Sequence, residues 1–82
     1  MHYEIYEVVK QYRFEIDGFG QVKAEVVKTI KPEMNSPYMW RCSHIYDGYA
    51  PNHGNSQALA EQELLFYIEH FDAKSAEIDP YF

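Results

Sequence analysis

Residues 56–72, SQALAEQELLFYIEHFD, are the only segment of the chain with a clear helical period of apolar residues. At about 100° per residue, five apolar positions fall on one stripe of such a helix. These positions are Ala60, Leu64, Tyr67, Ile68 and Phe71. Ser56, or Asn55 before it, stands just before the first turn and offers a side-chain oxygen to its free amides, which is typical of an N-cap. The sequence therefore predicts a helix over 56–72 whose apolar stripe covers a sheet.

The residues before this helix are mostly β-branched and aromatic, which is typical of strands. Apolar and polar residues alternate over 12–16 and again over 21–31, and Asp17-Gly18-Phe19-Gly20 between them favours a tight hairpin turn. The pattern predicts two paired strands over 3–17 and 20–31. Near Val9 the alternation changes phase, and either a β-bulge or a strand buried on both faces explains that change.

A third strand is predicted over 38–47, after a connection that prolines bound at both ends. Its even positions are mostly aromatic, and we expect them to face the helix: Tyr38, Trp40, Cys42, His44 and Tyr46. The order β-β-β-α predicts an α+β fold, a three-stranded antiparallel meander with one C-terminal helix packed on one face. We expect residues 1–82 to form a single domain, with a tail over 73–82 whose aromatic end docks on the domain or on a partner.

Composition limits the class of protein. A hydrophobic share of 46% and an aromatic share of 17% are typical of a folded chain, not a disordered one. The net charge is −6, and residues 47–82 carry all of the excess, with seven acids against the single base Lys74. A lone Cys42 excludes an internal disulfide, so we expect a cytoplasmic protein. The chain shows no leader and no apolar run of membrane-spanning length, so we expect no membrane partner.

The sequence offers little to catalysis or to metal binding. Cys42 and His44 share one strand face, but side chains two apart on a strand stand roughly 6 to 7 Å apart. That separation is too large for the hydrogen bond that activates a thiol. No CxxC pair and no HExxH helix is present among the four histidines and one cysteine. We therefore expect no enzyme, no cofactor and no metal site.

Two surfaces of the predicted helix are candidates for protein binding. The first is acidic and contains no lysine or arginine, so it would attract a basic surface of a partner; it comprises Glu61, Glu63, Glu69 and Asp72. The second is an apolar pair, Leu59 and Phe66, which lies about 100 to 120° from the core stripe. This pair forms a contact patch unless the C-terminal Tyr81 and Phe82 fold back over it.

The element order resembles the C-terminal part of a double-stranded-RNA-binding domain. That family places a lysine cluster at the start of its last helix, where this chain has Ser56-Gln57-Ala58-Leu59-Ala60 and then Glu61. The first helix of that family is also missing, so the resemblance covers element order alone. An acidic helix repels phosphate, so nucleic acid is the less favoured partner.

Basic residues on the strands leave a nucleic-acid alternative open. Arg13, Lys23, Lys28 and Arg41 mix with tyrosine and tryptophan there, although six acids share residues 1–46. The favoured hypothesis is a non-enzymatic protein-binding module, a small acidic inhibitor or adaptor that docks on a basic surface. In size and charge the chain resembles inhibitors encoded by phages and mobile elements, including anti-CRISPR proteins. A domain that functions as a homo-oligomer is a further alternative.

Overall fold

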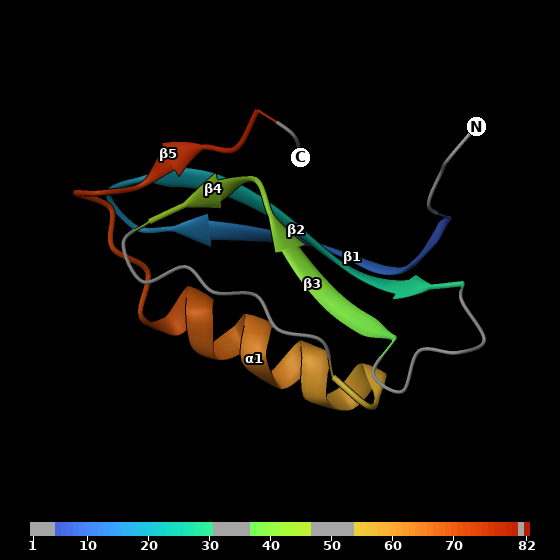
Figure 1. Ribbon diagram of the computed structural model, residues 1–82. Coiled ribbons are helices and arrows are strands. Elements are labelled where there is room, and N and C mark those ends of the chain that lie inside the picture. Colours follow the sequence, from blue (N-terminus) through green and yellow to red (C-terminus); the bar gives the residue numbers. More distant parts are fainter. Residues whose placement is uncertain (1–4, 31–36, 47–53, 81) are drawn as a thin grey trace.

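Three antiparallel strands and one helix make up most of the computed structural model, which describes residues 5–30, 37–46, 54–80 and 82. Strands β1 (Tyr6–Ile16), β2 (Gly20–Thr29) and β3 (Tyr38–Cys42) form a sheet in the order β1-β2-β3. Helix α1 (Gln57–Glu69) lies across one face of this sheet (Figure 1). The predicted α+β class, the meander and the single packed helix are confirmed.

The β1–β2 hairpin has the turn that its sequence predicts. Ile16 pairs with Gly20, and the amide of Phe19 donates to the carbonyl of Ile16 at 3.0 Å. Gly18 has φ 77° and Gly20 has φ 124°, values that side chains other than glycine rarely adopt. Further along β1 the pairing register shifts between Val8 and Lys10. A bulge at this point therefore explains the phase change near Val9.

The hydrophobic core lies between the sheet and α1. Alternate residues of β2 and β3 meet one stripe of α1 there, as the sequence predicts, and eight side chains are buried: Val22, Ala24, Val26, Trp40, Cys42, Ala60, Leu64 and Tyr67. Tyr38, Tyr46, Ile68 and Phe71 pack around this cluster and are partly buried. The alternation over 21–31 predicts one buried and one solvent-exposed face for β2, and this is wrong at its C-terminal end, because Val27 and Thr29 are buried as well.

Tyr67 ties α1 to the third strand. Its ring stacks on Tyr46 with centroids 4.3 Å apart and lies 4.7 Å from Trp40. Its hydroxyl donates to the carbonyl of His44 at 2.9 Å, and the hydroxyl of Tyr46 donates to the carbonyl of Tyr67 at the same distance. These reciprocal hydrogen bonds fix the helix end against the sheet.

The predicted strand over 38–47 is interrupted at Ser43. The amide of Lys23 donates to Ser43 Oγ at 3.0 Å, so the serine side chain takes the place of a backbone carbonyl in the ladder. The freed carbonyl of Ser43 accepts from the amide of Asp79 at 2.9 Å. Strand β4 (His44–Ile45) then pairs with β5 (Glu77–Ile78) in a second small sheet. The tail over 73–82 thus contains a strand that the sequence did not predict.

The predicted element ends shift by a few residues. Ser56 is the N-cap, since its Oγ accepts from the amide of Leu59 at 3.2 Å, and α1 begins at the next residue. The helix ends at Glu69 with His70 as C-cap, whose amide donates to the carbonyl of Phe66 at 3.1 Å. The predicted strand ends at positions 3, 4, 31 and 47 lie outside the described residues.

Candidate functional site

The outer face of α1, turned away from the core, carries three large apolar side chains that are exposed. Leu59, Leu65 and Phe66 are 46%, 53% and 63% exposed, and we call these three residues the outer strip. Leu59 and Phe66 are seven residues apart and therefore lie on one side of the helix, whereas Leu65 is about 100° further round the axis, with Gln62 and Glu69 between it and Phe66. Helix α1 thus exposes large apolar side chains outside its core stripe, among polar and acidic residues.

The C-terminal residue does not cover the outer strip. Phe82 lies on the opposite side of the sheet from α1, where its ring centroid is 5.8 Å from Arg41 Cζ. Figure 1 shows β5 and the C-terminal segment on that side. The alternative in which Phe82 folds over Leu59 and Phe66 is therefore wrong, and Tyr81 lies outside the described residues.

Glu61 faces the sheet edge and not the outside of α1. Its Oε1 accepts from Gln57 Nε2 at 2.9 Å and lies 3.7 Å from Lys10 Nζ on β1. The Gln57 hydrogen bond, together with Tyr12 and Lys10, lowers the pKa of the Glu61 carboxyl. The Tyr12 hydroxyl is buried near this carboxylate but does not form a hydrogen bond with it. Burial is the main cause that raises the pKa of Tyr12 to about 12, and the nearby Glu61 carboxylate is the second.

The other three predicted acids do not form one surface with Glu61. Asp72 follows α1 and stabilises a turn, accepting from the amide of Lys74 at 3.0 Å and from Ser75 Oγ at 2.9 Å. These hydrogen bonds, with that of Ser75 foremost, lower the pKa of Asp72. Glu63 and Glu69 are exposed on α1 and form no ion pair with a described residue. Only these two acids therefore flank the outer strip as free charges.

His70 completes the surroundings of the outer strip. The ring centroid of His70 lies 4.2 Å from that of Phe66, and His70 Nδ1 is 2.9 Å from the carbonyl oxygen of Phe66. The imidazole therefore holds one side of the Phe66 ring at the end of α1. The sequence did not point to Leu65 as part of this surface.

Three of the four basic residues predicted for the strand face lie on one face of the sheet. Arg13 and Lys23 are directly opposite each other in the β1–β2 register, on the face away from α1. Arg41 lies on this face too, with its Nη1 3.4 Å from Glu25 Oε1. Lys28 is on the other face, in phase with buried Val26, with Nζ 5.6 Å from the ring centroid of Tyr38. The prediction that Lys28 shares one strand face with Arg13, Lys23 and Arg41 is therefore wrong.

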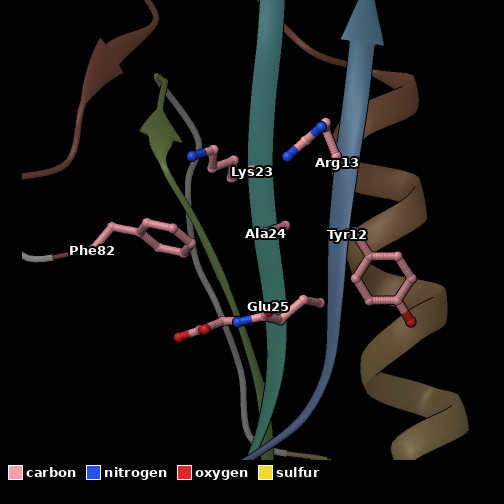
Figure 2. A pocket seen from close by; sticks show the side chains of 7 residues that line it. Tyr12, Arg13, Lys23, Ala24, Glu25 and Phe82 are labelled. Atoms are coloured by element: carbon pink, nitrogen blue, oxygen red, sulfur yellow. The ribbon is translucent and has the colours of Figure 1, made fainter.

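A pocket of about 500 Å³ opens on the face that carries Arg13 and Lys23. Its lining comprises Gln11, Tyr12, Arg13, Lys23, Ala24, Glu25 and Phe82. In Figure 2 the side chains of Arg13 and Lys23 lie near one another, and the ring of Phe82 reaches in from the C-terminal segment. The sequence predicted the cations of this pocket and an aromatic end that docks on the domain or on a partner, but not that Phe82 docks beside these cations.

The remaining chemistry is limited. Cys42 is fully buried, and burial raises the pKa of its thiol, which keeps the sulfur protonated and a poor nucleophile. Across residues 5–30, 37–46, 54–80 and 82, no group of three or more histidine, cysteine, aspartate or glutamate side chains is placed to hold a metal ion. No helix within these ranges is long and apolar enough to cross a membrane.

No known protein family, curated protein or solved structure matches this chain. Its function is therefore inferred from its own surfaces, of which the outer strip of α1 and the pocket beside Arg13 and Lys23 are the two candidates.

Proposed function

We propose that this protein is a non-enzymatic protein-binding module that lays the outer face of α1 into an apolar groove of a partner with a basic rim. The observation that carries the proposal is the outer strip. Leu59, Leu65 and Phe66 are exposed together on a helix whose other face already fills the core. Docking of an amphipathic helix in a groove is a common mode of protein recognition, and Leu59 and Phe66 have the i, i+7 spacing of the anchors in such helices.

The outer strip offers a useful binding free energy. Single exposed apolar side chains are ordinary on protein surfaces, but neighbouring large ones form a patch. Full burial of a leucine or phenylalanine contributes about 1.5–3 kcal/mol. Since the three side chains are about half exposed, covering them contributes roughly 3–4 kcal/mol in total. Phe66 is the most exposed of the three and has the aromatic character of many interface hot spots.

Charge favours a basic partner over a second copy of the chain. Helix α1 has no lysine or arginine, so two copies packed through the outer strip would bring only acids to their shared rim. Glu63 and Glu69 are exposed and have no described cation beside them. A groove edged by lysine or arginine would pair with these acids, and the net charge of −6 would speed its approach.

An inhibitor or an adaptor would act in this way, by occupying a groove that another ligand needs or by linking two proteins. The sequence prediction of an acidic docking surface is kept in part, with Glu63 and Glu69 as its members. Glu61 and Asp72 have structural roles instead, through Lys10 and through the turn at 73–75. A reducing compartment such as the cytoplasm suits the unpaired Cys42.

Affinity of a captured partner for variants of the outer strip tests the proposal. A protein that co-purifies from the cells that make this chain is isolated, and its Kd is measured for the wild type and for Leu65→Gln/Phe66→Gln. Glutamine keeps the helix propensity while removing the apolar surface. We expect the double variant to bind about 100-fold more weakly, since it loses about 2–3 kcal/mol of burial.

The matched control is Ile78→Gln, which removes an apolar side chain that is 74% exposed on β5, away from the outer strip. It should bind like the wild type. Glu63→Lys/Glu69→Lys should slow association and weaken binding most at low salt. Equal binding by the wild type and Leu65→Gln/Phe66→Gln would contradict the proposal. Sedimentation that shows the free chain as a dimer, with dissociation in this double variant, would assign the strip to a second copy instead.

A further inference from the structure

We infer that the pocket on the sheet face away from α1 binds a small ligand that carries a phosphate group next to an aromatic ring, the chemistry of a nucleoside monophosphate. In this assignment the phosphate lies between Arg13 and Lys23, and the ring lies against Phe82 (Figure 2). The site is separate from the outer strip, which lies on the far side of the sheet.

The cation pair is the first observation. Arg13 and Lys23 are directly opposite across β1 and β2, where Cβ atoms stand about 4.5–5.5 Å apart. Like charges at such positions repel, so the arrangement lowers stability unless an anion lies between them. Neither residue forms an ion pair with a described acid. Both cations are exposed and free to bind a ligand.

Of the acids on the same face, Glu25 is paired with Arg41, whereas Glu15 keeps its charge because its partner Gln21 is neutral. Glu25 Oε1 lies 3.4 Å from Arg41 Nη1, and Glu15 Oε1 accepts from Gln21 Nε2 at 3.3 Å. Arg13 and Lys23 therefore remain without a contacting carboxylate at one end of the pocket. An arginine and a lysine together provide several donors to the oxygens of a phosphate, and such charge-assisted hydrogen bonds are short and strong.

Phe82 is the second observation. Its ring lines the pocket while remaining 41% exposed, and Arg41 Cζ lies 5.8 Å from the ring centroid. Contact with the guanidinium holds the ring beside the sheet. Its remaining exposed surface can pack against a planar heterocycle, because every base has a π-face that stacks on aromatic side chains. Gln11 on the pocket wall adds an amide that can donate and accept.

The size of the pocket and the net charge favour a small ligand over a nucleic-acid strand. A volume of about 500 Å³ suits a single small molecule. A strand needs a series of phosphate contacts, whereas this face has two free cations on a chain of net charge −6. The repulsion of the whole chain grows with the number of phosphates, so one phosphate group fits best.

Titration of the ¹⁵N-labelled protein with adenosine monophosphate, followed by amide chemical shifts, tests the inference. We expect saturable shifts in residues 11–13 and 23–25 at low salt. Inorganic phosphate and adenosine, titrated separately, should each bind at least about tenfold more weakly, because each makes only part of the contacts. Arg13→Gln/Lys23→Gln should weaken binding of the nucleotide by about tenfold or more. Phe82→Ala should weaken binding of the nucleotide but not of phosphate.

Lys28→Gln is the matched control, since this lysine is on the same strand as Lys23 but faces the other way. It should bind the nucleotide like the wild type. Fluorescence of the buried Trp40 shows that each variant is folded. The inference is overturned by absence of shifts at about 10 mM nucleotide, by equal binding in Arg13→Gln/Lys23→Gln, or by equal binding of adenosine. Tighter binding of a ten-nucleotide single-stranded DNA than of the nucleotide would assign the face to nucleic acid.

Discussion

Replacement of Tyr67 by alanine should leave the domain largely unfolded at room temperature. Tyr67 contacts Trp40 and Tyr46 through its ring and donates to the carbonyl of His44 through its hydroxyl. Truncating a large buried ring costs about 3–5 kcal/mol. A single small core rarely supplies more than about 3–5 kcal/mol in total. Far-UV circular dichroism and the fluorescence of Trp40, the only tryptophan, measure the loss on thermal and urea unfolding.

Tyr67→Phe separates the packing of this ring from its hydrogen bond. The phenylalanine keeps the stacked contacts and removes only the donor to the carbonyl of His44. We expect a cost of about 1–2 kcal/mol, the range for leaving one buried acceptor without its partner. Equal destabilisation by Tyr67→Phe and Tyr67→Ala would contradict the claim that Tyr67 stabilises the fold mainly through the packing of its ring.

Leu64→Ala and Leu65→Ala should have opposite outcomes although the two residues are neighbours. Leu64 is fully buried between α1 and the sheet, so its truncation should lower the free energy of unfolding by about 2–5 kcal/mol. Leu65 is on the outer strip and more than half exposed, so its truncation should change stability by no more than about 0.5 kcal/mol. Alanine favours the helix at both positions. Urea unfolding measures both values.

This pair of variants also tests the two-faced character of α1. Leu65→Ala should still weaken binding of the partner, whereas Leu64→Ala acts through folding alone. A similar loss of stability in both variants would show that Leu65 packs inside the domain, and the outer strip would then lose one of its three members.

Local patterns in the sequence were enough to predict the sheet and the helix. The Asp17-Gly18 pair predicted the hairpin, because its glycine adopts a positive φ that few other residues tolerate. The apolar period over 56–72 predicted the helix and its buried stripe, because burial of α1 follows the angle of each side chain around the axis. The phase change near Val9 left two explanations open, and the register shift of β1 favours the bulge.

Features that depend on the packing of distant segments were not predicted. Strand β5 has two residues, too few for an alternating pattern, and it pairs with β4, which begins where Ser43 interrupts β3. The ion pair of Glu61 with Lys10 depends on where α1 crosses the sheet. The placement of Phe82 beside Arg41, which completes the pocket, depends on the path of the C-terminal segment. The predicted acidic surface was therefore too large, because it included Glu61 and Asp72. For the pocket, the sequence predicted the cations Arg13 and Lys23 but not the position of Phe82.

Site-specific photo-crosslinking in the cells that make this protein tests most directly whether α1 serves the core with one face and a partner with the other. A photoreactive phenylalanine analogue is placed at Phe66 in one variant and at exposed Ile78 in another. We predict one crosslinked partner from position 66, none from position 78, and loss of the crosslink when Leu59→Gln is added. Crosslinks from position 78 without any from position 66 would contradict a docking role for the outer strip.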